Sequence, residues 1–253
     1  MIRAEAERLA TALVDLDPAM PLPTCPEWTA SDLLWHVAEV HWFWANVLSR
    51  GAITDADVEQ IEETKPVRPD SMAELALFRA QSTDALCDQL AVLADDEHRW
   101  SWSGEHTVGF TRRMQVFEAT MHRVDAELTA GLEVTPLDPE VAAGAVGHAV
   151  AHMWGWLPAW ATYTPAAVVA FETSDTGDRW LAEVGRWQGT GPESGRAFDE
   201  PTCRPSDGEP AATVRAPAQQ LALWAWRRGG AATPTGSPEA VAALMAVVEN
   251  GIQ

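Results

Sequence analysis

The first part of the chain carries apolar residues at the spacing of amphipathic α-helices. This pattern predicts helices over residues 2–16, 29–50, 70–95, 110–130 and 138–156, with a short helical piece at 54–63. Thr29, followed three residues later by Asp32, is a capping-box signal for the start of the second helix. Gly131 is placed to end the fourth helix, and Pro158 stops the fifth. The N-terminal part is therefore expected to be entirely helical.

After about residue 160 the pattern changes to one typical of strands. Residues 167–173 and 180–184 predict a hairpin, and residues 212–216 predict a further strand. Residues 188–210 are rich in Gly, Pro, Ser and Asp and are expected to lack regular structure. Helices are predicted over 217–229 and 238–250. The expected fold class is α+β, with a helical domain over 1–160 and a small α+β domain over 161–253.

Charge and composition narrow the possible functions. The formal net charge is -20, which argues against nucleic acid and anionic membranes as partners, because both require a basic surface. No apolar run reaches the roughly 20 residues of a membrane span, and the charged N-terminus is unlike a signal peptide. Cys25, Cys87 and Cys203 are too widely spaced for a zinc-binding pair or a disulfide framework. We therefore expect a cytoplasmic protein, either a monomer or a homodimer.

Tryptophan is unusually frequent, with 13 residues against one tyrosine. Most are expected in the core, but indole also suits a cavity wall that must be apolar and still donate a hydrogen bond. Trp28, Trp35 and Trp42 repeat every seven residues and so lie on roughly one side of the second helix. Trp35, Trp42 and Trp154 are our candidates for walls of a substrate or thiol pocket.

Two pairs of residues have the spacing of metal ligands on a helix. Glu118 and His122 are four residues apart, and so are His148 and His152. Residues at this spacing share one helical face and can bind one metal ion. His36, beside the tryptophan stripe, is a candidate third ligand for the first pair. By spacing alone, His148 and His152 are the better pair of metal ligands. Spacing therefore does not establish Glu118 and His122 as the metal-binding pair.

Three motifs resemble those of the mycothiol-dependent maleylpyruvate isomerase family, within the DinB-like metalloprotein superfamily. P-T-C-P-E-W-T-A-S-D-L-L-W-H at 23–36 is similar to P-x-C-P-x-W-x-x-x-D-L-x-x-H. E-A-T-M-H-R-V-D at 118–125 is similar to E-x-x-x-H-x-x-D. L-A-L-W-A-W-R-R at 221–228 is near L-x-L-W-x-x-G-R, but Arg227 stands where glycine is usual. The likeness runs from about residue 5 to 250.

The resemblance implies a fold and a set of functional residues. It implies a DinB-like four-helix bundle and a C-terminal domain that closes over the site. It implies that His36, Glu118 and His122 bind a divalent metal, expected to be zinc. The terminal arginine of the third motif, here Arg228, would reach toward an anionic substrate, and the replacement at Arg227 leaves the choice between these two arginines open.

The residue types agree with thiol chemistry. Two neutral imidazoles and one carboxylate leave a coordination position open, as catalytic zinc sites require. Zinc lowers the pKa of a bound thiol, and the resulting thiolate is a nucleophile at neutral pH. The resemblance then implies mycothiol as cosubstrate and either an isomerase or an S-transferase acting on a small electrophile. His148 and His152 would line the pocket, and Asp125 would either hold a ligand histidine or lie exposed.

Two other functions fit the same residues. One is a non-catalytic, regulatory metal-binding protein that keeps the bundle. The other is a hydrolase in which metal-bound hydroxide replaces the thiolate.

Overall fold

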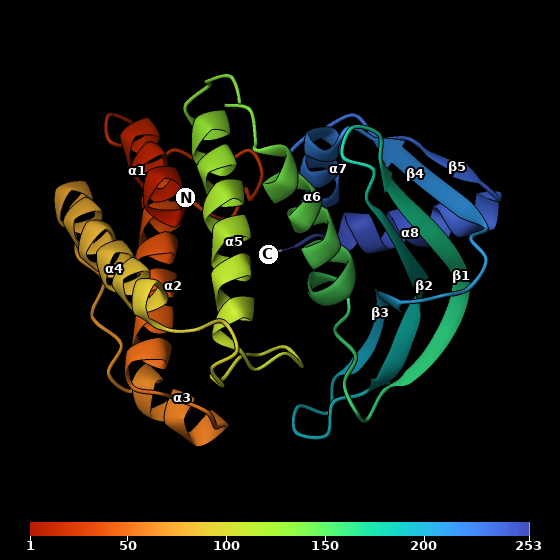
Figure 1. Ribbon diagram of the computed structural model, residues 1–253, viewed down its shortest axis with the longest axis horizontal. Helices are drawn as coiled ribbons and strands as arrows, with labels where there is room; N and C mark the ends of the chain where they lie inside the picture. The colour runs from red at the N-terminus through yellow and green to blue at the C-terminus, as the bar shows by residue number, and fades with distance from the viewer. Residues whose placement is uncertain (253) are drawn as a thin grey trace. The chain divides into compact units, whose positions relative to one another are not determined.

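The computed structural model describes residues 1–252 (Figure 1). The chain forms two compact units, Met1–Thr135 and Pro136–Gln253. Helix α6 (Pro139–His148) packs against α7 (Ala218–Ala225) inside the second unit, and Trp226 Nε1 donates a hydrogen bond to the Ala145 carbonyl at 3.0 Å. The chain therefore divides before α6, whereas the change of pattern near residue 160, which set the expected boundary, marks only the start of the sheet.

The first unit is the predicted helical bundle (Figure 1). Its helices are α1 (Ile2–Leu13), α2 (Ala30–Ser49), α3 (Asp55–Glu62), α4 (Met72–Val92) and α5 (Val108–Thr129). Helix α2 packs against α4 and α5, and α1 packs against α4 and α5. Four long helices thus share a core, and the short α3 contacts α2. None of the described helices is both long and apolar enough to cross a membrane.

The start of α2 is fixed by side-chain hydrogen bonds. The Thr29 hydroxyl accepts from the Asp32 backbone N–H at 3.3 Å, and Asp32 Oδ2 accepts from the Thr29 N–H at 2.8 Å. This reciprocal capping box is the one expected from the sequence. Asp32 also accepts from Arg68 Nη1 at 2.6 Å. The cap sets where the helix begins, and it therefore sets which way His36, about two turns further on, projects.

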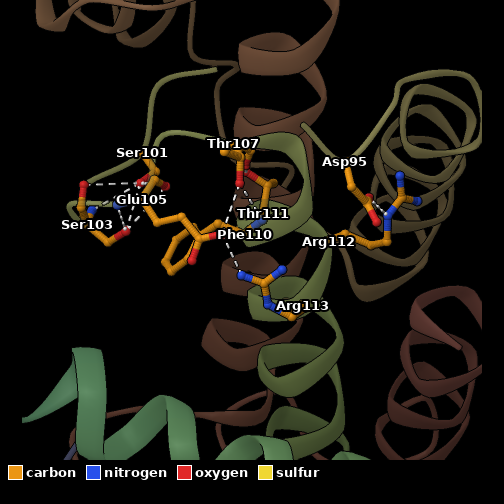
Figure 2. Close-up of polar contacts among 9 residues, drawn as sticks. All are labelled: Asp95, Ser101, Ser103, Glu105, Thr107, Phe110, Thr111, Arg112 and Arg113. Carbon is orange, nitrogen blue, oxygen red and sulfur yellow. Dashed lines mark hydrogen bonds and ion pairs between the residues drawn. The ribbon is translucent and has the colours of Figure 1, made fainter. Parts of the chain in front are cut away.

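The segment before α5 is irregular but well bonded (Figure 2). The Thr107 hydroxyl caps α5 by accepting from the Phe110 N–H at 3.1 Å. Glu105 Oε1 accepts from the Thr107 hydroxyl at 3.1 Å and from Arg113 Nη2 at 2.6 Å. These bonds tie the loop to the first turns of α5, the helix that carries Glu118 and His122.

The second unit is built on one mixed sheet (Figure 1). Its strands are β1 (Thr162–Thr173), β2 (Arg179–Thr190), β3 (Ala197–Pro205), β4 (Ala212–Ala216) and β5 (Pro234–Gly236), in the order β3-β2-β1-β4-β5. Strands β1 and β4 pair in parallel, and the other pairs are antiparallel. Helix α8 (Pro238–Asn250) packs against β1, β2 and β3. The α+β class is thereby confirmed.

Two details of the second unit differ from expectation. Residues 188–210 are irregular only at 191–196 and 206–210, because β2 continues to Thr190 and β3 runs from Ala197 to Pro205. Strand β3 lies at the sheet edge, where the missing N–H of Pro201 is tolerated, and this proline conceals the strand in the sequence. The fifth helix is also shorter than predicted, since α6 ends at His148 and continues as a π-helix, η1 (Ala149–Met153).

Candidate metal centre

The bundle brings together three of the predicted ligands. The rings of His36 on α2 and His122 on α5 lie 4.8 Å apart, centre to centre, and meet at 77°. Glu118 Oε2 lies 3.4 Å from His122 Nε2, one turn along the same face of α5. Helices α2 and α5 are in contact, so a motif from each helix contributes to one cluster of imidazole and carboxylate groups.

Asp125 holds the His122 ring from its other side. Its Oδ2 lies 3.0 Å from His122 Nδ1, and its side chain is 3% exposed. Asp125 is thus a buried partner of the histidine rather than an exposed helix carboxylate. With Nδ1 bonded to Asp125, the Nε2 atom is the one that faces Glu118, and a carboxylate on the opposite ring nitrogen is typical of metal-binding histidines.

The two imidazoles have opposite protonation tendencies. Burial, aided by the charge of His122, lowers the pKa of His36 to about 3, so His36 is neutral at physiological pH. Burial also opposes the charged form of His122, but the hydrogen bonds that its ring donates to the Asp125 and Glu118 carboxylates outweigh burial and raise the pKa of His122 to about 9. The cluster therefore holds one neutral and one protonated imidazole beside two carboxylates. The two carboxylates, Glu118 and Asp125, therefore favour a positive charge within this cluster.

The donor types suit a divalent cation, although their present spacing is that of an ion pair. A desolvated neutral imidazole, a carboxylate, and an imidazole oriented by a second carboxylate are the ligands of catalytic zinc sites. Among residues 1–252, no group of three or more His, Cys, Asp or Glu side chains is spaced for holding a metal ion. Glu118 and His122 contact one another directly. Metal binding by these residues is therefore a proposal and not an observation.

Trp28 belongs to the cluster and was not among the predicted pocket residues. Its ring centre lies 4.7 Å from that of His36 and 6.5 Å from that of His122, nearly parallel to the latter at 24°. The sequence did contain one indication of its role, because Trp28 is the first member of the seven-residue tryptophan repeat. The other two members lie elsewhere: Trp35 stacks on Phe78 at 5.8 Å, and Trp42 lines a separate cavity of about 180 Å³.

Gln115 is a second residue that the sequence reasoning missed. It is fully buried on α5, and neither its amide oxygen nor its amide nitrogen has a hydrogen-bond partner among the described residues. A buried amide without partners is costly, which marks a position where a bound molecule can supply them. Gln115 precedes His122 by seven residues, so the two lie on one side of the helix.

The remaining predicted site residues lie in the second unit. The rings of His148 and His152 are 5.2 Å apart, and His148 stacks on Trp226 at 6.4 Å. Trp154 follows the π-helix and contacts Phe171. Arg227 Nη1 donates to the Glu249 carbonyl at 2.9 Å, and the Arg228 guanidinium donates to the Trp226 carbonyl and lies 5.8 Å from the Trp226 ring centre.

A four-helix bundle with histidines and acids gathered between two helices, followed by an α+β unit, defines a DinB-like protein. Residues 2–127 match the model of the mycothiol maleylpyruvate isomerase N-terminal domain. The helical unit of the chain therefore belongs to this domain family.

Solved structures extend the likeness over nearly the whole chain. A crystal structure of a mutant of mycothiol-dependent maleylpyruvate isomerase has a TM-score of 0.60 and 13% identity, covering 94% of this chain and 92% of that one. A crystal structure of mycothiol-dependent maleylpyruvate isomerase has a TM-score of 0.59 and 14% identity, with the same coverage. At this identity the likeness establishes the fold. A comparison with curated protein sequences finds no match.

Proposed function

We propose that this protein is a metal-dependent enzyme that uses mycothiol as cosubstrate, acting as an isomerase or S-transferase on a small electrophile. The observation that carries the proposal is the meeting of His36 and His122, with ring centres 4.8 Å apart, beside Glu118. The family match over residues 2–127 supports the choice of thiol. All three residues also lie within the stretches 23–36 and 118–125, whose sequences resemble motifs of the family, and this supports the proposal.

His36, Glu118 and His122 would hold the cation, which we propose to be zinc. A bound divalent cation supplies one thing to the reaction, a lowered thiol pKa, so that thiolate is present at neutral pH. Asp125 keeps His122 Nε2 directed at the cluster through its bond to Nδ1. Trp28 covers both imidazoles with an apolar ring and reduces the access of water to the nucleophile.

The chemistry needs no other reagent. In the isomerase version, the thiolate adds to one carbon of a cis double bond conjugated to a carbonyl, and the electron pair moves to the carbonyl oxygen. The former double bond then rotates as a single bond. Return of the electrons expels the thiolate and leaves the trans product. In the transferase version the sulfur–carbon bond remains, the enolate takes up the proton that the thiol lost when it became thiolate, and the product is a thioether.

The backbone at Arg227 supports equating Arg228 with the terminal arginine of the family motif. Arg227 has φ 57°, in the left-handed region. Glycine enters this region without strain, and other residues rarely do. The chain thus keeps the backbone that the usual glycine would favour, which argues against a shift of the motif by one position. We propose Arg228 as the group that binds an anionic part of the substrate.

Metal analysis followed by mycothiol titration tests this proposal. The purified protein should contain about one divalent metal per chain, and His36→Ala and His122→Ala should each lose most of it. His98→Ala is the matched control, since this histidine lies exposed in the loop before α5. Full metal content in either site variant would show that the ligand assignment is wrong.

The second stage separates thiol chemistry from the alternatives. Mycothiol should bind only to the metal-loaded protein, and Gln115→Leu should weaken that binding while metal content stays unchanged. A protein that contains metal but does not bind mycothiol would refute the proposal that mycothiol is the cosubstrate. In that case, turnover that needs no added thiol would point to a hydrolase, and absence of any turnover would point to a regulatory protein.

A further inference from the structure

The second unit contains a cavity walled by aromatic rings, of which only Trp154 was a candidate for the substrate or thiol pocket. Its volume is about 230 Å³. Trp154, Trp156, Trp187 and Phe198 form its aromatic walls, and Glu200 is the one acidic side chain in its lining. The aromatic residues come from the segment after the π-helix and from β2 and β3 (Figure 1).

The rings stand at angles to one another, as the sides of a box do. Trp156 and Trp187 lie 5.0 Å apart, centre to centre, and meet at 77°. Phe198 lies 5.6 Å from Trp187 at 32°. Trp154 is held over β3, because its carbonyl accepts hydrogen bonds from the Thr202 hydroxyl at 2.8 Å and from the Cys203 N–H at 3.1 Å. The walls are therefore tied to the sheet.

Sheet register places the carboxylate among these rings. Glu200 on β3 pairs directly with Trp187 on β2, and residues directly opposite one another have their side chains on the same face of a sheet. Phe198 is two residues before Glu200 on β3, so it lies on that face as well. The lining of the cavity thus combines aromatic side chains with one carboxylate.

The end of a helix adds to the negative field. Val247, Asn250 and Gly251, at the C-terminal end of α8, also line the cavity. The carboxyl end of a helix carries a partial negative charge that favours cations.

Three arginines of the chain itself must be weighed against this field. Arg227 donates to the Glu249 carbonyl and Arg228 donates to the Ile252 carbonyl at 3.4 Å, so both reduce the negative field at the end of α8. Arg196 lies 5.1 Å from the centre of the Phe198 ring. None of the three arginines is part of the cavity lining, and the carboxylate of Glu200 is the negative charge that remains there.

We propose that this cavity binds a small quaternary ammonium compound. A cage of aromatic faces with a carboxylate is suited to a cation too bulky and too weakly hydrated for an ordinary ion pair. Trp154 is part of the cavity lining, and its buried Nε1–H has no acceptor among the described residues, so a ligand oxygen that reaches this group would satisfy it. The ligand class is therefore an alkylated ammonium that carries a hydroxyl or carboxylate oxygen.

Choline is the probe for the test, and dimethylbutanol, its uncharged carbon isostere, is the control ligand. Titration of the whole protein, followed by tryptophan fluorescence and calorimetry, should show saturable binding of choline. Dimethylbutanol should bind about tenfold more weakly, because the cation–π attraction is lost. Equal binding of the two compounds, or no saturation by choline, would overturn the proposal.

Variants assign the binding to this cavity. Glu200→Gln and Trp156→Leu should each weaken choline binding about tenfold. Trp156 is 62% exposed, so its replacement leaves the core intact. Glu193→Gln, at an exposed position in the loop between β2 and β3, and Trp102→Leu, 46% exposed in the first unit, are the matched controls. Loss of choline binding in these controls, but not in Glu200→Gln or Trp156→Leu, would show that choline binds elsewhere.

A vesicle experiment separates a free ligand from a lipid headgroup. The cavity is small, so we assign it to a free molecule. Phosphatidylcholine vesicles should not sediment the protein, and their cosedimentation would overturn that part of the assignment. Glu200→Gln and Trp156→Leu should leave metal content and mycothiol binding unchanged. A failure of the choline proposal can therefore be distinguished from a failure of the proposed function.

Discussion

His122 Nδ1 lies 3.0 Å from Asp125 Oδ2, so a buried carboxylate fixes the orientation of a candidate metal ligand. Replacing Asp125 with Asn removes the charge that helps raise the pKa of His122 and weakens the ring's anchor. We expect Asp125→Asn to lower zinc affinity roughly 10- to 100-fold, as changes to groups behind metal ligands do. Competition with a chromophoric chelator measures this. Asp88→Asn, with a side chain 77% exposed on α4, should bind zinc like the wild type, and equal loss in both variants would contradict the role.

Trp28 should matter to the centre, and Trp35 should not. The Trp28 ring packs on both His36 and His122, whereas Trp35 stacks on Phe78. We expect Trp28→Leu to weaken zinc binding about tenfold by freeing the His36 ring, and Trp35→Leu to leave it unchanged. Both tryptophans are half-buried, so unfolding by urea provides the check that stability alone does not explain the difference.

Arg123 should be the most sensitive charged residue of the bundle. Its Nε lies 2.7 Å from Glu5 and its Nη1 lies 2.6 Å from Glu127, and its side chain is 1% exposed. Arg123→Met leaves two partly or fully buried carboxylates without their cation and should cost about 3–5 kcal/mol of unfolding free energy. Arg3→Met breaks an exposed pair with Asp84 and should cost at most about 1 kcal/mol. Denaturant unfolding compares them, and similar losses would refute the distinction.

His41 should make the bundle sensitive to acid. It is buried with Nδ1 2.8 Å from the Thr83 hydroxyl, and burial, aided by Arg79 and the two site histidines, lowers its pKa to about 3. An unfolded histidine titrates near 6.5. Because the folded pKa is the lower one, this contribution to stability is present above pH ~6.5 and is lost as the pH falls toward 3.

The test compares the wild type with His41→Gln, which keeps a hydrogen-bonding group at the position but cannot titrate. The unfolding free energy of the wild type should fall more steeply between about pH 6.5 and pH 4 than that of the variant. Parallel pH profiles would show that His41 does not contribute.

Arg227→Gly should be close to neutral in stability, although it removes a hydrogen bond. Relief of the left-handed backbone at φ 57° is worth roughly 1 kcal/mol. Loss of the hydrogen bond to the Glu249 carbonyl costs a similar amount of unfolding free energy, so the two effects nearly cancel. Arg227→Ala loses the bond and keeps the strain, so it should be the less stable variant by about 1 kcal/mol, and the reverse order would refute this account.

Local patterns predicted the helices well. The capping signal at Thr29 and Asp32 correctly predicted the start of α2, because capping depends on residues a few positions apart. Strand β3 was missed because pairing with β2, which is not a local property, overrides the local signals of Pro201 and its neighbours.

The site was harder to predict for the same physical reason. Spacing placed Glu118 beside His122, but spacing alone preferred His148 and His152. Only packing of α2 against α5, or the family resemblance, adds His36 to the first pair. The burial of Asp125 was equally hidden, since most positions of α5, including charged ones, are buried.

The parallel pairing of β1 with β4 has a consequence for how the protein folds. Val169 pairs with Ala212, and the whole β2–β3 hairpin lies between them in the chain. That pair closes a longer loop than the hairpin pairs β1–β2 and β2–β3 do. The docking of β4 against β1 should therefore come late in the folding of the second unit.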